Sequence, residues 1–223
     1  MLRENLTQAV EDYLKTIYEI TQTDGRASTN QIAERMGVTA ASVTGMLKRL
    51  SANDPPLLEY RKHHGVELTE EGERVALEVI RHHRLLELFL HDTLGYAWDE
   101  VHAEADRLEH VISEELEERI AQTLGDPRHD PHGDPIPSRE LHLPSERLVS
   151  LDRLRPGQRA VIQRVRNDDP ALLRHLGSMA LLPQTELRVL DYSSFDGNLR
   201  LQVGEQVYVL GPSVTGQIFV EIL

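Results

Sequence analysis

The stretch TNQIAERMGVTAASVTGMLKRL, residues 29–50, decides the fold of the first part of this chain. Its pattern predicts two short helices that meet at a turn containing Gly37. Ala33 is small enough for a close helix approach, and Val43 and Leu47 are spaced to face inward. This is the spacing that a helix-turn-helix requires. An ordinary helical hairpin fits the motif equally well, so the flanking sequence has to decide between them.

Apolar residues at helical spacing extend this pattern in both directions. The predicted helices cover residues 5–22, 29–35, 39–51, 69–94, 98–110 and 113–124. Between the third and fourth helices, two short strands at 57–60 and 66–68 enclose a charged turn. A β-hairpin in this place is the usual form of a wing. It favours a DNA-binding helix-turn-helix over the alternative of an ordinary helical hairpin.

The composition changes after the helical part. Residues 125–137 are rich in proline and glycine and predict a linker. Five short alternating segments follow, with one predicted helix at 170–176 between the first two, and they suggest a small β-barrel. We therefore expect a mainly α chain with a β C-terminal domain. The predicted domains are a winged helix-turn-helix, a helical domain and a β domain, at residues 1–72, 73–137 and 138–223.

Two groups of residues are suited to contact DNA. Small side chains at the start of the second helix of the motif can approach base edges and thymine methyl groups; these are Thr39, Ala40, Ser42 and Thr44. Basic side chains on the same helix and in the hairpin can contact phosphates; these are Lys48, Arg49, Arg61 and Lys62.

Six potential metal ligands follow on two predicted helices. They are His83 and Glu87, then His102, Asp106, Glu109 and His110. Side chains three or four apart share a helix face, so the last four form one predicted stripe. Neighbouring carboxylates repel, and a divalent cation would turn that repulsion into coordination. A solvated polar face is the alternative for an isolated pair, but six converging ligands favour a metal site.

The charge is uneven along the chain, whose net charge is −13. Residues 73–124 carry 13 acidic residues against five arginines, so cations should collect there. The first 72 residues carry a small net negative charge, so their electrostatic attraction to DNA is weak. This suggests that bound metal assists DNA binding. The chain has no cysteine, which excludes disulfides and thiolate metal sites. No stretch approaches the roughly 20 apolar residues of a membrane span, and we expect a cytoplasmic protein.

Four segments carry a resemblance to a known family: EDYLKTIYEI at 11–20, HRLLELFLHDTLG at 83–95, EVHAEADRLEHVISEELEERI at 100–120 and DPHGDPIP at 130–137. Together they resemble the diphtheria-toxin-repressor family, and within it the manganese-responsive regulators. The resemblance covers nearly the whole chain. It implies an SH3-like third domain of the FeoA-like kind, and a homodimer that binds a double-stranded DNA operator.

The resemblance also implies a division of the ligands. A primary site would contain Asp12, Asp106, Glu109 and His110, and an ancillary site would contain His83, Glu87 and His102. Either Asp168 or Asp169 would complete the ancillary site, although Asp169 is equally suited to cap a helix. Oxygen ligands at 12 and 106 favour Mn²⁺, with Fe²⁺ as the alternative. The bacilli-type pattern has glutamate where this chain has Lys15, which puts a binuclear arrangement in doubt.

The function implied is metal-dependent regulation, by repression, of manganese or iron uptake genes. We expect no small-molecule substrate and no enzyme activity. Two alternatives stay open at this point: a metal-dependent hydrolase that uses the same ligands, and a winged-helix regulator that ignores metal. The histidines at 63 and 64 in the hairpin are better interpreted as solvent-exposed or phosphate-facing residues than as ligands. Those at 129 and 132 in the linker could bind metal, but they are less favoured because no matched partners accompany them.

Overall fold

The computed structural model describes residues 6–61, 65–167 and 169–223, which form two compact units. Unit 1 contains the described residues up to 82, together with 109–112 and 137–142. Unit 2 contains residues 83–108, 113–136 and 143–223. The chain is mainly helical up to residue 124 and forms a β-sheet after residue 148, so the predicted fold class is confirmed.

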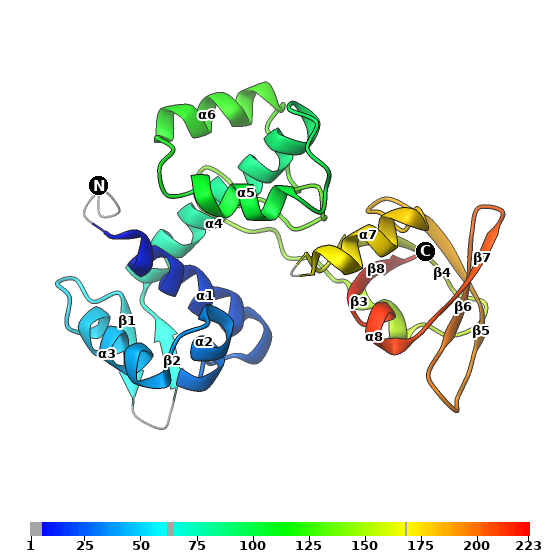
Figure 1. Ribbon diagram of the computed structural model, residues 1–223, viewed down its shortest axis with the longest axis horizontal. Helices are drawn as coiled ribbons and strands as arrows, with labels where there is room; N and C mark the ends of the chain where they lie inside the picture. Colours follow the sequence, from blue (N-terminus) through cyan, green and yellow to red (C-terminus); the bar gives the residue numbers. More distant parts are fainter. Residues whose placement is uncertain (1–5, 62–64, 168) are drawn as a thin grey trace. The chain divides into compact units, whose positions relative to one another are not determined.

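Unit 1 contains the helix-turn-helix, which is confirmed. Its helices are α1 (Gln8–Asp24), α2 (Thr29–Met36) and α3 (Ala40–Ser51), and α1 and α3 both contact α2 (Figure 1). Ser28 and Gln31 form a capping box that starts α2, and Gly37 ends it in a left-handed conformation at φ 65°. Val43 and Leu47 on α3 are fully buried, as predicted.

The predicted wing is present as the hairpin of β1 (Leu58–Arg61) and β2 (Gly65–Leu68). Ala27, just before α2, makes a bridge to Val66 and so attaches the wing to the helix-turn-helix. This approach requires glycine at 65, because φ is +85° and a Cβ there would lie 3.1 Å from the carbonyl oxygen of Ala27. The three residues at the tip, 62–64, lie outside the described residues, and they include Lys62, predicted to contact DNA.

Helix α4 (Glu70–Asp92) begins in unit 1 and ends in unit 2. Unit 2 continues with α5 (Val101–Leu108) and α6 (Glu114–Thr123), which Ser113 caps as predicted. Helix α5 is shorter than the predicted helix at both ends, and it stops before Glu109. No helix among the described residues is long and apolar enough to cross a membrane.

The β part of unit 2 is a six-stranded sheet in the order β3-β8-β4-β5-β6-β7. Its strands are β3 (Val149–Ser150), β4 (Arg159–Val165), β5 (Glu186–Tyr192), β6 (Leu199–Val203), β7 (Gln206–Leu210) and β8 (Ile218–Ile222). Strand β3 was not predicted, because two residues are too short to show alternation. The remaining elements are η2 (Leu151–Arg153), α7 (Pro170–Ser178) and α8 (Pro212–Thr215). Leu173 and Leu176 of α7 are buried in the core that the sheet forms.

Candidate metal centres and DNA interface

The first group of ligands lies in unit 1, and we call Asp12, Glu109 and His110 the head cluster. Asp12 comes from α1, and the other two follow the end of α5. His110 Nε2 lies 2.8 Å from an oxygen of Asp12 and 3.3 Å from an oxygen of Glu109. Glu109 is buried, whereas the side chain of Asp12 is 40% exposed. One donor atom from each residue lies within 4.8 Å of the others, which is close enough to hold one metal ion.

The second ring nitrogen of His110 is also bound. Its Nδ1 lies 2.5 Å from the buried carboxylate of Glu11, which leaves Nε2 directed at the head cluster. Burial alone lowers the pKa of His110, but the hydrogen bonds to Asp12 and Glu11 and the charge of Glu109 outweigh burial and raise it to about 9. A carboxylate behind a histidine in this way fixes the ring in the orientation that metal ligation needs.

Two further residues shape the head cluster. Lys15 Nζ lies 3.0 and 2.8 Å from the two oxygens of Glu109, so an ammonium group already faces this carboxylate. His82, which is fully buried on α4, donates from Nδ1 to the backbone carbonyl of Glu109 at 3.1 Å. This hydrogen bond fixes the segment that carries Glu109 and His110 against α4.

The second group lies in unit 2, and we call His83, His102 and Asp106 the histidine cluster. His83 Nδ1 lies 3.2 Å from Asp106, and His102 Nε2 lies 3.6 Å from it. Glu87 Oε1 lies 3.0 Å from both His83 Nε2 and His102 Nδ1. The structure thus brings together the ancillary ligands that the resemblance implies.

Asp106 lies on α5 in unit 2, where its carboxylate contacts His83 and His102 of the histidine cluster. The resemblance groups it with Asp12, Glu109 and His110, and that grouping stays a prediction. Helix α5 ends at Leu108. His102 and Asp106 share a helix face four residues apart, but Glu109 and His110 no longer continue that face.

The sequence analysis missed a third group, which we call the buried cluster: Glu87, Asp130 and His132. All three side chains are buried, and His132 was disfavoured because it lies in the proline-rich linker. His132 Nδ1 lies 3.7 Å from Glu87 and 4.0 Å from Asp130. Only the concentration of Asp, His, Pro and Gly at 130–137 marked this segment in the sequence.

The charges in the buried cluster are strongly coupled. Burial, and then the charges of Glu87 and Asp134, raise the pKa of Asp130 well above its usual range. Burial raises the pKa of Glu87, but the neighbouring histidines, His83 first, hold it well below its usual range. Burial lowers the pKa of His132, but Glu87 and then Asp130 raise it to about 9. Two buried carboxylates beside one imidazole are a set of donors that suits a divalent cation.

The two aspartates of the β domain have separate outcomes. Asp169 caps α7, because its side chain accepts a hydrogen bond from the backbone N–H of Ala171 at 2.8 Å. Asp168 lies outside the described residues, so its predicted role as a ligand stays a prediction.

The predicted base-reading residues lie at the start of α3. Thr39, Ala40 and Ser42 are exposed, and Thr44 is half-buried with its hydroxyl donating to the carbonyl of Ala40 at 2.9 Å. Thr39 is the N-cap, and its Oγ1 accepts from the backbone N–H of Ser42. Further along α3, Lys48 and Arg49 are exposed and can reach phosphates.

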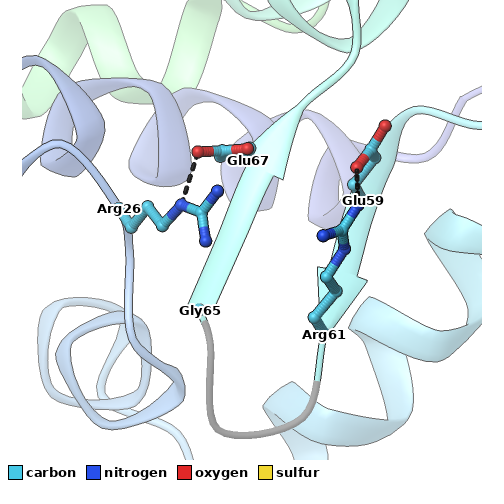
Figure 2. Close-up of a pocket in the computed structure, with 5 residues that line it drawn as sticks. All are labelled: Arg26, Glu59, Arg61, Gly65 and Glu67. Carbon is cyan, nitrogen blue, oxygen red and sulfur yellow. Dashed lines mark hydrogen bonds and ion pairs between the residues drawn. The ribbon is translucent and has the colours of Figure 1, made fainter.

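The wing carries paired charges, which Figure 2 shows. Arg26 Nε lies 2.5 Å from Glu67, and Arg61 lies 3.4 Å from Glu59. The two glutamates are directly opposite each other in the hairpin register, so each arginine offsets an unfavourable pair of like charges. Arg26 was not among the predicted residues, because it lies far from the hairpin in sequence. The bridge between Ala27 and Val66 brings it there.

A winged helix-turn-helix whose first helix supplies a residue to a cluster of candidate metal ligands is typical of one class of protein, the metal-dependent DNA-binding regulators. Comparisons identify the family. Models of the iron dependent repressor match residues 5–66, as its N-terminal DNA binding domain, and 69–138, as its metal binding and dimerisation domain. A FeoA domain model matches residues 149–222.

Individual proteins agree with this result. The iron-dependent repressor IdeR of Mycobacterium leprae is 32% identical over 198 residues, covering 83% of this chain and 85% of that protein. IdeR of Mycobacterium tuberculosis is 39% identical over 132 residues, which span 59% of this chain and 56% of that protein. A solved manganese-dependent transcriptional repressor in complex with manganese is 37% identical, with a TM-score of 0.89 over 96% of this chain and all of that one. The chain belongs to the iron-dependent (diphtheria toxin) repressor family, which confirms the resemblance.

Proposed function

We propose that this chain is a metal-activated transcriptional repressor that binds a double-stranded operator as a homodimer. The activating ion is Mn²⁺ or Fe²⁺, and the regulated genes serve uptake of that metal in the cytoplasm where the protein acts. The dimer occupies two half-sites about one helical turn of DNA apart, or a multiple of it.

The position of Asp12 is the observation that carries this proposal. Asp12 lies on α1, which contacts α2 of the helix-turn-helix, and its carboxylate meets His110 from a distant part of the chain at 2.8 Å. Holding Asp12 together with Glu109 and His110 fixes α1 relative to the segment after α5. A divalent cation bound there would supply the charge that lets the two carboxylates stay together. The orientation of the DNA-binding helices then depends on metal occupancy.

The donor atoms support the choice of ions. The head cluster offers two carboxylates and one imidazole, and no thiolate ligand is possible because the chain has no cysteine. Oxygen-rich sites of this kind suit Mn²⁺, and a single imidazole keeps Fe²⁺ a candidate. Lys15 already provides a positive charge to Glu109, so we infer that the head cluster holds one ion.

The test is fluorescence anisotropy of a labelled operator candidate taken from DNA beside a metal-transporter gene. Chelator-treated protein is titrated alone, with Mn²⁺ and with Fe²⁺, and unrelated DNA serves as the control. We expect tight binding only with metal. The Asp12→Ala variant should lose the metal response in DNA binding to a greater extent than it loses thermal stability in chelator. Glu19→Gln, on the same helix, is the matched control because Glu19 pairs with Arg35 at the surface.

Equal affinity with and without metal in the wild type would contradict the proposal and favour a metal-independent regulator. An unchanged metal response in Asp12→Ala would contradict the assigned coupling through α1. The ion that gives binding at the lower free concentration is the better candidate for the physiological activator.

A further inference from the structure

Strand β7 forms one edge of the six-stranded sheet, and in the described part of the chain it pairs only with β6 (Figure 1). Its side chains alternate between two environments. Val207 and Val209 are 52% and 63% exposed, whereas Leu210 is buried and Tyr208 packs against the core of the β domain. We call Val207 and Val209 the edge strip, because they place apolar surface along the free edge of the sheet.

The edge strip is unusual for an edge strand. Such strands normally carry a charge, a proline, a bulge or a very short length, each of which discourages pairing with another chain. The opposite edge strand of this sheet, β3, has only two residues. Strand β7 has five residues, none of them charged or proline, and its register with β6 shows no shift. On β6 the residues opposite the two valines are the polar Gln202 and Arg200, so the apolar strip is confined to the edge.

The hairpin register shows which backbone groups of β7 face outward. A two-residue turn that starts at Gly204, with φ +57°, joins β6 to β7. In such a hairpin the closing pair, here Val203 and Gln206, exchanges hydrogen bonds, and hydrogen-bonded pairs then alternate along the ladder. Every second residue of β7 from Gln206 onward therefore bonds to β6. The N–H and C=O groups of Val207 and Val209 point to the free edge.

The sequence of β7 is self-complementary. It reads Gln-Val-Tyr-Val-Leu, with one valine on each side of Tyr208. When two copies pair antiparallel with Tyr208 opposite itself, Val207 of each copy lies opposite Val209 of the other. Each valine can then donate one hydrogen bond and accept one across the edge. The valine side chains meet, and the two tyrosines form an aromatic cross-strand pair, which also favours pairing.

We propose that β7 is a self-association surface, at which the β7 strands of two copies of this chain pair antiparallel around Tyr208. Such a contact is isologous, because each copy offers the same residues. It lies outside residues 69–138, which match the metal binding and dimerisation domain of the family, so it gives the chain a second contact with its own copies. A strand of another protein would need only the outward backbone groups, whereas the match of valine to valine favours a second copy.

Disulfide cross-linking of the full chain tests the register. The chain has no cysteine, so every disulfide formed comes from an introduced residue. Val207→Cys and Val209→Cys chains, mixed and oxidised, should give cross-linked pairs. Either chain alone should give far fewer, because each position lies two residues along the strand from its own counterpart, too far for a disulfide. Arg188→Cys, exposed on the inner strand β5, is the matched control and should give only background when mixed with Val209→Cys.

Two double variants test the same register by charge. Val207→Glu with Val209→Lys places opposite charges across each pair, so association should be retained. Val207→Lys with Val209→Lys places like charges there, so association should weaken by at least about tenfold. Both variants carry the same change beside Arg200 of β6, so they differ only in the sign of the charge at position 207. Sedimentation velocity over a series of concentrations measures association, and the dimerisation helices are unchanged in both.

The proposal is overturned if the wild type associates no more strongly than the variant with two lysines. It is also overturned if the mixture of cysteine variants gives no more cross-linking than either chain alone or than the Arg188→Cys control. Circular dichroism identifies any double variant that does not fold, and the single cysteine variants then decide. All of these measurements are made in chelator and without DNA, so their outcome is independent of the metal response in the proposed function.

Discussion

The affinity of the head cluster for metal should depend steeply on pH between 7 and 9. Without metal, the pKa of His110 is raised to about 9, so its imidazole keeps a proton on both nitrogens at neutral pH. Ligation through Nε2 requires the loss of one proton. At pH 7 this competition weakens binding about 100-fold, because the pKa lies about two units higher. The apparent affinity should rise about tenfold per pH unit and level off above pH 9.

The assay isolates the head cluster in a Glu87→Gln background, because the carboxylate of Glu87 faces candidate metal ligands of both the histidine cluster and the buried cluster in unit 2. Mn²⁺ affinity is measured under anaerobic conditions by competition with a fluorescent chelator from pH 6.5 to 9.5. Glu11→Gln in this background removes the negative charge that faces Nδ1 of His110. The pKa of His110 should fall, and the affinity should level off at a lower pH. Glu19→Gln, elsewhere on α1, should leave the profile unchanged.

A flat profile between pH 7 and 8.5 would refute the reasoning, because it would mean that metal binding displaces no proton from His110. The same conclusion would follow if Glu11→Gln levelled off at the same pH as its parent. Isothermal titration in buffers of different ionisation enthalpy gives an independent count of protons, and near one proton per ion is expected at pH 7.

Three further predictions concern stability and DNA binding. Metal-free protein should lose stability as pH rises from about 6.5 to 9. The pKa of His110 is raised to about 9 in the folded state, so protonation of His110 stabilises the fold fully below its unfolded pKa of about 6.5, and this contribution is lost as pH rises to the folded pKa. Glu11→Gln should flatten this loss in thermal unfolding. Gly72→Ala should destabilise unit 1 by roughly 2 kcal/mol or more in urea, because its Cβ would lie 1.9 Å from the carbonyl oxygen of Leu57; an unchanged midpoint would contradict this. Arg61→Ala should lower the slope of log affinity for DNA against log salt by about 0.9 if the arginine contacts one phosphate, whereas Arg119→Ala, which removes an exposed side chain of α6, should leave the slope unchanged.

Local signals made the helix-turn-helix predictable. Ala33, Gly37 and the inward positions Val43 and Leu47 lie within one short stretch, so their spacing reflects a single local geometry. The i, i+4 pair of His83 and Glu87 was predictable for the same reason.

The end of helix α5 was not predictable in this way. No glycine or proline marks the end of α5 at Leu108, so the helical stripe continues in the sequence where it stops in the structure. The buried cluster was missed because Asp130 and His132 lie in a segment without helix or strand periodicity. Tertiary contacts alone bring that segment to Glu87.

The paired charges of the wing bear on why metal should control DNA binding at all. A wing whose arginines are free would attract any DNA through its phosphates, with or without metal. Here Arg26 and Arg61 each face a glutamate of the hairpin, so the wing contributes little net charge (Figure 2). Since the electrostatic attraction is weak, we infer that operator affinity depends on the relative placement of two DNA-binding units in the dimer. Placement is what the head cluster can set through Asp12. On this reasoning, Glu67→Gln should raise affinity for unrelated DNA and reduce the ratio by which metal increases binding.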